Sequence, residues 1–231
     1  MAVRGLIYDH DGTLIDSIDL VVEATNAALA DAGFARVTRE GIMRGMIYPT
    51  VERMGYHSGS DDDLLNSEIA RRYYAEAWRI GASAARPYLG VRELLEAVHR
   101  MGLPQAMLSN NRGDFIRQIM TAHGLAQFVD PILGEEDVTE PKPSGAGIGE
   151  IARRWGLSPR EVLLIGDSTA DAGAARAAGC PSLGVTWGTH SRAELADAGF
   201  DRLIDRPDEL GALIVSGQFQ TSAAPANVGR V

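Results

Sequence analysis

The chain of 231 residues contains a single cysteine, Cys180, so no disulfide can form within it. Absence of internal disulfides is typical of a reducing compartment, and we expect a cytoplasmic protein. No histidine flanks Cys180 in the sequence. A lone thiol in that setting is expected to be a buried side chain at the start of a strand rather than a nucleophile.

Positive charge and long apolar stretches are also scarce. The formal net charge of −9 argues against nucleic acid or an anionic membrane surface as the main partner. No apolar stretch approaches the ~20 residues that a helix needs to cross a bilayer. A strand is expected to start near Val3, which leaves no signal-peptide pattern at the N-terminus. An acidic protein that handles phosphate needs local positive charge, and a bound cation is the simplest source.

Lysine occurs only once. Of the 22 basic residues apart from histidine, Lys142 is the only lysine and all the others are arginine. It stands between two prolines, in Glu140-Pro141-Lys142-Pro143. A lysine kept in so arginine-rich a chain suggests a site that needs a compact ammonium rather than a planar guanidinium fork.

Short apolar segments recur along the chain with helical stretches between them. They read as buried strands at residues 5–8, 105–108, 162–165 and 182–185, with a weaker one at 202–205. This alternation predicts an α/β fold, a Rossmann-like parallel sheet core with helices on both faces. Ser158 and Glu161 form a capping-box pattern with Pro159 between them, and Gly179 is a plausible C-cap for a helix at 169–178.

One interval, from about residue 15 to residue 86, lacks the strand pattern. It reads as helices at 16–32, 38–43 and 61–80, and a further helix follows at 91–100. We therefore predict an all-helical cap inserted after the first strand. The predicted domains are a cap at 15–86, a catalytic core at 1–14 with 87–215, and a disordered tail at 216–231.

Polar motifs stand directly after three of the predicted strands. They are Asp9-His10-Asp11-Gly12-Thr13, Ser109-Asn110-Asn111, and Gly166-Asp167-Ser168 with Asp171. Each has a structural alternative as a turn, a helix cap or a solvated loop charge. However, the carboxyl ends of parallel strands meet at one edge of a sheet, so these motifs are expected to share a site. Paired carboxylates with a lone ammonium are typical of magnesium-dependent phosphoryl transfer.

The four motifs together, Lys142 included, resemble those of the haloacid dehalogenase-like hydrolases over about residues 3 to 214. The resemblance implies a Rossmann-like core with a cap between the first and second motifs, where the helical stretch falls. The segments 166–181, 184–188 and 198–201 are most similar to phosphoglycolate phosphatases. The implied function is a Mg²⁺-dependent phosphatase that hydrolyses a small phosphate monoester, 2-phosphoglycolate or similar.

The resemblance also implies roles for individual residues. Asp9 would attack phosphorus and form an aspartyl-phosphate, while Asp11 would act as general acid and then as general base. Mg²⁺ would be held by Asp9, the backbone carbonyl of Asp11 and Asp167, with Asp171 orienting that shell. Five residues would hold the substrate's phosphoryl group: Gly12, Thr13, Ser109, Asn110 and Lys142.

Related chemistries leave two alternatives open. Phosphonate-cleaving relatives need a cap lysine, which this chain lacks, and haloacid dehalogenases lack the second aspartate, here Asp11. Sugar-phosphate mutases of the β-phosphoglucomutase type keep both aspartates and remain the enzymatic alternative, although they more often carry valine where this chain has Thr13. A non-catalytic phosphate-binding protein is the other alternative. It would be expected to have lost a motif residue, and none is lost.

Several features beyond the motifs bear on substrate and partners. His10 replaces the apolar residue usual at its position, and in an extended segment it would point away from the cleft; a titrating role near the site is the alternative. The expected partner is a small phosphorylated metabolite, and the chain could be a monomer or a homodimer. Six cap residues could contact the leaving group or form a solvated helix face: Arg44, Tyr48, Arg53, Arg71, Arg72 and Trp78.

Overall fold

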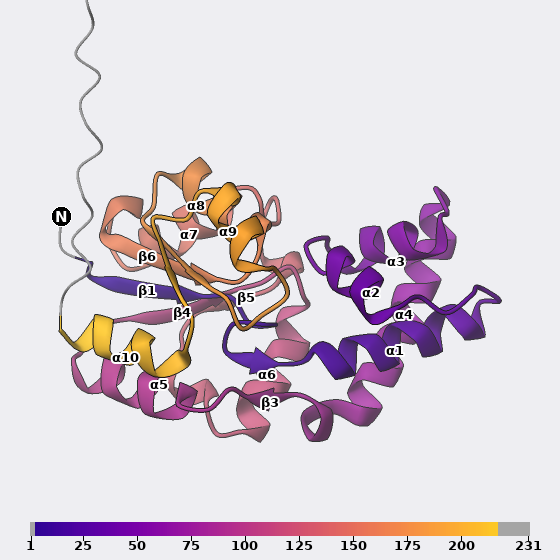
Figure 1. The fold of residues 1–231 in the computed structure, drawn as a ribbon, viewed down its shortest axis with the longest axis horizontal. Helices are drawn as coiled ribbons and strands as arrows, with labels where there is room; N and C mark the ends of the chain where they lie inside the picture. Colours follow the sequence, from indigo (N-terminus) through magenta and orange to yellow (C-terminus); the bar gives the residue numbers. More distant parts are fainter. Residues whose placement is uncertain (1–2, 217–231) are drawn as a thin grey trace, which may run out of the picture.

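The computed structural model describes residues 3–216 and contains a six-stranded sheet in the order β5-β4-β1-β6-β7-β8 (Figure 1). Every neighbouring pair in this sheet is parallel, which confirms the predicted α/β class. Five strands lie where apolar segments predicted them; β5, only two residues long, was not predicted. The strands are β1 Gly5–Tyr8, β4 Gln105–Leu108, β5 Ile132–Leu133, β6 Val162–Gly166, β7 Ser182–Val185 and β8 Arg202–Ile204.

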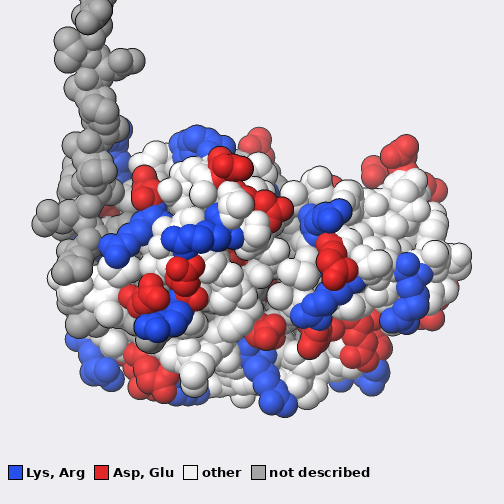
Figure 2. Space-filling view, in the orientation of Figure 1, with Lys and Arg blue, Asp and Glu red and all other residues white. Residues whose placement is uncertain are grey.

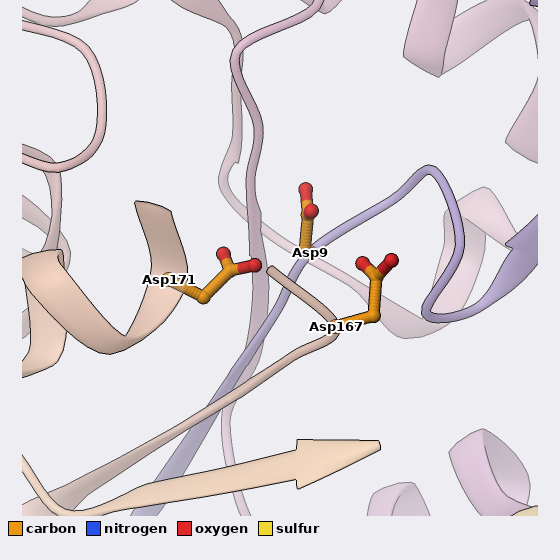
Figure 3. Close-up of side chains that lie close together, drawn as sticks. All are labelled: Asp9, Asp167 and Asp171. Carbon is orange, nitrogen blue, oxygen red and sulfur yellow. The ribbon is translucent and has the colours of Figure 1, made fainter. Parts of the chain in front are cut away.

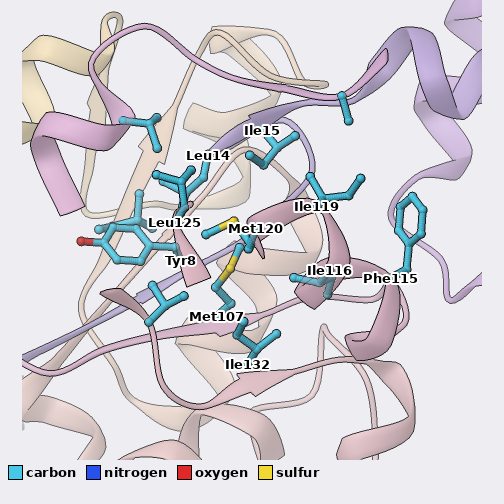
Figure 4. Packing of buried hydrophobic residues seen from close by; sticks show 14 of the residues in the cluster. Tyr8, Leu14, Ile15, Met107, Phe115, Ile116, Ile119, Met120, Leu125 and Ile132 are labelled. Atoms are coloured by element: carbon cyan, nitrogen blue, oxygen red, sulfur yellow. The ribbon is translucent and has the colours of Figure 1, made fainter. Parts of the chain in front are cut away.

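Helices cover both faces of the sheet, because alternate strand side chains enter two separate apolar clusters. Leu6 and Tyr8 of β1 belong to one cluster, and Ile7 between them belongs to the other. Figure 4 shows the first cluster, where Tyr8 and Met107 pack near side chains of α6. That face carries α5 Val91–Arg100, α6 Gly113–Ala122 and α10 Pro207–Val215; the other carries α7 Ala146–Arg154 and α8 Thr169–Ala178, with α9 Arg192–Ala198 packed beside α8.

The predicted helical insert leaves and rejoins the sheet layer through a short antiparallel pair, β2 Ile15–Asp16 and β3 Arg86–Pro87. Between them lie α1 Ile18–Asp31, α2 Arg39–Gly45, α3 Thr50–Ser58 and α4 Asp63–Ala84, with α1 and α3 packed on α4. Figure 1 shows these helices grouped beside the sheet. The division into cap and core domains stays a prediction, because one apolar cluster runs through both parts.

Two features of this insert differ from the sequence prediction. Helix α3 was not predicted, because its buried face has few apolar residues: Thr50, Arg53 and Met54 are buried, whereas Val51 and Tyr56 are exposed. The β2–β3 pair was also missed, because two residues per strand give no alternation to recognise. The predicted tail at 216–231 lies outside the described residues, except for Ser216, the C-cap of α10.

Charges of both signs are interspersed on the face of the molecule shown in Figure 2. Many are paired within one helix, as Arg153 is with Glu150 at 2.9 Å. Within residues 3–216, no helix combines the length and the apolar character that crossing a membrane requires.

Cys180 is buried just before β7, as predicted, and it provides a first test of the structure. Burial raises the pKa of its thiol to about 12. Because the thiolate is the reactive form, we expect Ellman's reagent to label the native protein at least ~100-fold more slowly than the unfolded chain. Rapid stoichiometric labelling of folded protein would contradict this placement.

Candidate active site

The site lies where three loops leave neighbouring central strands. Asp9 follows β1, Ser109 follows β4 and Asp167 follows β6, and β1 lies between the other two strands. The strand order reverses direction at β1, and open α/β sheets bind ligands at such a point. One pocket there brings together six of the predicted site residues: Asp9, Asp11, Ser109, Asn110, Lys142 and Asp167.

Asp9, Asp167 and Asp171 form a compact acidic cluster at this point (Figure 3). Each offers a carboxylate oxygen within 4.8 Å of the others, and all three side chains are buried. Burial raises the pKa of Asp9 well above its usual range, and the charges of Asp171 and Asp167 add to this effect against the attraction of Lys142. Burial and the neighbouring Asp171 raise the pKa of Asp167 in the same way. The three carboxylates therefore carry more negative charge than the neighbouring positive group neutralises.

Lys142 supplies the positive charge within this cluster. Its Nζ lies 2.9 Å from Asp9 Oδ1 and 2.6 Å from Asp171 Oδ1. Burial alone would lower the pKa of Lys142, but the two carboxylates raise it above its usual value, so the ammonium stays charged. Asn110 fixes the lysine backbone: its Oδ1 accepts from Lys142 N at 2.8 Å, and its Nδ2 donates to Lys142 O at 2.7 Å.

Asp167 is held by two threonines. Thr13 Oγ1 donates to Oδ1 at 3.1 Å, while Thr189 donates its N–H to Oδ2 at 2.6 Å and its hydroxyl to the same oxygen at 2.7 Å. Gly12 passes close by with a φ of 78°, and a Cβ there would lie 2.4 Å from Asp167 Oδ2. The Gly12 and Thr13 N–H groups already donate within the turn, to Ile15 O and His10 O. Their predicted role in holding phosphate therefore stays a prediction.

Asp171 combines two roles that the sequence left as alternatives. It completes the capping box of α8, because its Oδ2 accepts from Ser168 N at 3.1 Å and from Ser168 Oγ at 2.5 Å. Its other oxygen accepts from Lys142 Nζ. The helix cap thus fixes the carboxylate that positions the lysine.

Asp11 lines the same pocket as Asp9 and Lys142 and has polar contacts of its own. Ser17 Oγ donates to its Oδ1 at 2.5 Å, and Asn111 Nδ2 donates to its Oδ2 at 3.0 Å. Burial would raise the pKa of Asp11, but the nearby His10 and these hydrogen bonds hold it below its usual range. The resting structure therefore favours the carboxylate.

His10 corrects the simple expectation for an extended segment. It is fully buried and is not among the described pocket-lining residues, yet its Nδ1 lies 3.1 Å from Asp11 Oδ1. The reason is a tight turn that begins at His10, whose carbonyl accepts from Ile15 N at 3.0 Å. Strict alternation of side chains ends at such a turn, so His10 contacts a candidate catalytic residue from behind.

The helical insert closes over the pocket through contacts that the sequence did not reveal. Tyr74 OH donates to Asn111 Oδ1 at 2.9 Å, and Thr50 N donates to Glu135 Oε2 at 2.8 Å. Asn110 Nδ2 also donates to Ile47 O at 2.9 Å. Of these, only Asn110 was a candidate from sequence. A helix-capping or loop asparagine looks the same in sequence whether or not it meets another element.

The six cap residues that were predicted as possible contacts of the leaving group lie in different places. Arg53 lines the catalytic pocket, and Tyr48 lines a neighbouring cavity. The remaining four point elsewhere: Arg71 and Arg72 pair with Glu68, and Arg44 and Trp78 are exposed.

Comparisons with known proteins agree with this geometry. A family model described as haloacid dehalogenase-like hydrolase matches residues 6–185. A phosphoglycolate phosphatase of Yersinia pseudotuberculosis serotype I is 32% identical over 195 residues, covering 81% of this chain and 82% of that protein. One from Aliivibrio fischeri is 27% identical over 238 residues, covering 99% and 98%.

A solved structure supports the same assignment. The protein, described as a haloacid dehalogenase-like hydrolase from Bacteroides fragilis, superposes with a TM-score of 0.84 at 30% identity, covering 90% of this chain and 99% of that one. The chain therefore belongs to the haloacid dehalogenase-like hydrolase family, and within it to the phosphatases that resemble phosphoglycolate phosphatase.

Proposed function

We propose that this phosphatase hydrolyses a small phosphate monoester, 2-phosphoglycolate or a compound like it, through an aspartyl-phosphate on Asp9 and with Mg²⁺ as cofactor. The observation that carries the proposal is the buried pairing of Asp9 with Lys142 inside a cluster of three carboxylates. The names of the relatives, phosphoglycolate phosphatases, support the substrate class.

Asp9 is oriented as a nucleophile. Its Oδ1 accepts from His10 N at 2.7 Å and lies 2.9 Å from Lys142 Nζ. No residue of the described part of the chain donates a hydrogen bond to Oδ2. We therefore assign Oδ2 as the attacking atom. Its bond to phosphorus forms as the bond from phosphorus to the ester oxygen breaks.

Asp11 is placed to move the proton. The leaving alkoxide needs a proton in the first half, and the attacking water must lose one in the second half. The hydrogen bonds from Ser17 and Asn111 favour the carboxylate, the form needed for the second half. A dianionic phosphate bound beside Asp11 would raise its pKa, because like charges disfavour ionisation. The proton for the first half is then taken up with the substrate.

The electrostatics of the pocket require cations. A carboxylate within ~4 Å of one phosphate charge is repelled by about 4 kcal/mol at an effective dielectric of ~20. Lys142 offsets part of this repulsion, and Ser109 Oγ lines the same pocket as a further donor. Mg²⁺ bound here would neutralise charge on the phosphoryl oxygens.

The donor set fits Mg²⁺. It consists of oxygens only, which Mg²⁺ prefers, and carboxylate oxygens of Asp9 and Asp167 lie within 4.8 Å of each other in the buried acidic cluster. Asp9, Asp167 and the backbone carbonyl of Asp11 would hold the ion. Asp171, which accepts hydrogen bonds from Lys142 and Ser168, would orient the groups around the ion.

Activity is expected to depend strictly on the metal. EDTA should abolish turnover, Mg²⁺ should restore it, and Ca²⁺ should inhibit, because its looser coordination misplaces the nucleophile. Bound metal requires ionised carboxylates, and the pKa values of Asp9 and Asp167 are raised. Protons therefore compete at a higher pH than at ordinary carboxylates. The Mg²⁺ concentration for half-activation should rise as pH falls, starting above the usual carboxyl range. Full activity in thoroughly chelated enzyme would contradict the metal assignment.

The substrate proposal is tested by a panel of phosphate monoesters with Mg²⁺, including 2-phosphoglycolate and hexose phosphates. Release of inorganic phosphate is measured together with isomerisation of each sugar phosphate. A phosphatase releases phosphate from every substrate that it turns over. Isomerised sugar phosphate without release of phosphate would indicate a mutase instead.

A further inference from the structure

Arg53 of α3 is buried in the catalytic pocket, and two of its donor atoms have no hydrogen-bond partner. Its side chain is only 4% exposed, and it lines the pocket together with Asp9 and Asp11. Within residues 3–216, its Nε and Nη2 have no hydrogen-bond partner, and it forms no ion pair with a described carboxylate. Its guanidinium carbon lies 4.6 Å from the centre of the Tyr73 ring, which packs against one face of the group.

Such an arrangement is costly for the free protein. Buried donors without acceptors destabilise the fold, because the protein does not replace the hydrogen bonds that water would make. Arginine stays charged under these conditions, so it does not escape the cost by losing its proton. A pocket that keeps two guanidinium donors without acceptors is therefore suited to an anionic ligand.

The position of Arg53 indicates which part of a substrate it would meet. Lys142, on the core side of the pocket, pairs with the proposed nucleophile and is assigned to the transferring phosphoryl group. The loop between α2 and α3 contributes Met46 and Ile47 to the pocket lining, and α3 contributes Arg53. Of these three, only Arg53 is charged. It is therefore available to the leaving group, because Lys142 is assigned to the transferring phosphoryl group.

The unpartnered atoms also indicate the shape of the ligand. Nε and Nη2 form one edge of the guanidinium, and two parallel N–H donors on one edge match a carboxylate or phosphate bidentately. The catalytic cavity is about 20 Å³ in volume, room for roughly one water molecule. Even the transferring phosphoryl group needs more room than this, so the volume does not restrict the size of the leaving group.

We propose that Arg53 determines specificity by binding a second anionic group on the leaving-group side of the substrate. The substrate is then a phosphate monoester that carries a carboxylate or a second phosphate near the ester. This inference rests on the proposed phosphatase function and names its substrate class from the cap residue rather than from the relatives.

The test uses three esters of matched length: 2-phosphoglycolate with a carboxylate, ethylene glycol bisphosphate with a second phosphate, and 2-hydroxyethyl phosphate with a neutral end. We expect the wild type to prefer at least one anionic ester over the neutral one by ~100-fold or more in kcat/KM, because a site built to pair a group rejects analogues that lack it. Which ester is preferred distinguishes a carboxylate from a phosphate ligand.

Arg53→Met should reduce that preference by at least ~30-fold, and Arg53→Lys should reduce it less, because charge remains but the fork is lost. The matched control is Arg71→Met on α4, an exposed arginine paired with Glu68, which should keep the preference. Arg53→Met should also melt close to the wild type, because it removes two buried donors without acceptors and keeps an apolar side chain beside Tyr73.

Several results would overturn the inference. They are equal losses on all three esters, which would place Arg53 on the transferring phosphoryl group, a lower melting temperature with no change in preference, and a wild type that does not discriminate. Turnover of hexose phosphates but of none of the three esters would also overturn it while leaving the phosphatase function intact. A wild type that hydrolyses no phosphate ester with Mg²⁺ would instead contradict the proposed function itself.

Discussion

Asp9→Asn is expected to leave no more than a trace of turnover in a protein that folds normally. An amide cannot form the aspartyl-phosphate, and removal of a covalent nucleophile lowers kcat by ~10³-fold or more. The measurement is steady-state release of phosphate under saturating Mg²⁺, with Asp19→Asn on the exposed surface of α1 as the matched control. Retention of more than a few per cent of the wild-type kcat would exclude Asp9 as the nucleophile.

The same variant should not be unstable. The pKa of Asp9 is raised in the fold, chiefly by burial, so its carboxylate is less favourable in the folded than in the unfolded chain at neutral pH. Removal of that charge should therefore lower the free energy of unfolding only slightly, although one contact with Lys142 is lost. In chelated buffer, Asp9→Asn should melt near or above the wild type. Mg²⁺ should raise the melting temperature of the wild type more than that of the variant, because a metal that binds the folded form stabilises it.

Lys142→Arg should lose at least ~10-fold in kcat/KM, and Lys142→Ala should lose more. The Nζ atom lies between Asp9 and Asp171 at 2.9 Å and 2.6 Å, in a side chain only 4% exposed. The wider guanidinium does not fit that space without moving a carboxylate, and ~1 Å of misplacement can cost ~100-fold in rate. Kinetics of the two variants against 2-phosphoglycolate and a neutral ester give the measurement. Unchanged kcat/KM in Lys142→Arg would show that a point charge is not required.

The two variants of Lys142 are expected to differ in melting temperature. Lys142→Ala leaves three buried carboxylates without their ammonium, and the loss of one partner from a buried ion pair costs ~3–5 kcal/mol. We expect a lower melting temperature that Mg²⁺ partly restores. Lys142→Arg keeps the charge and should melt closer to the wild type. Acylation of the only lysine is a weaker test, because burial and a raised pKa protect the amine in the native state.

Short-range features of this protein were predictable because neighbouring residues determine them. The apolar segment at 5–8 became β1, and the capping box of Ser158 and Glu161 formed as predicted, with Glu161 Oε2 accepting from Ser158 N at 2.9 Å. The polar residues after three strands were expected to meet because parallel strands end at one edge, and Asp9, Ser109 and Asp167 do line one pocket. Their chemical roles remain proposals.

Only the tertiary structure could supply the partners of these residues. Thr189 binds Asp167 from the loop after β7, and Asn111 joins Asp11 to Tyr74 of the cap. Neither the threonine nor the asparagine carries a local pattern that reveals such contacts.

Arg53 shows most clearly what could not be predicted from sequence, because it was one of several cap arginines that a solvated helix face explained equally well. Helix α3 buries mostly polar residues, so its placement depends on packing against α4 and on closure over the pocket. The sequence alone determined which groups stand at the strand ends, because local patterning decides where strands stop. Which charged group in the pocket keeps donors without acceptors was decided by contacts between residues far apart in the chain.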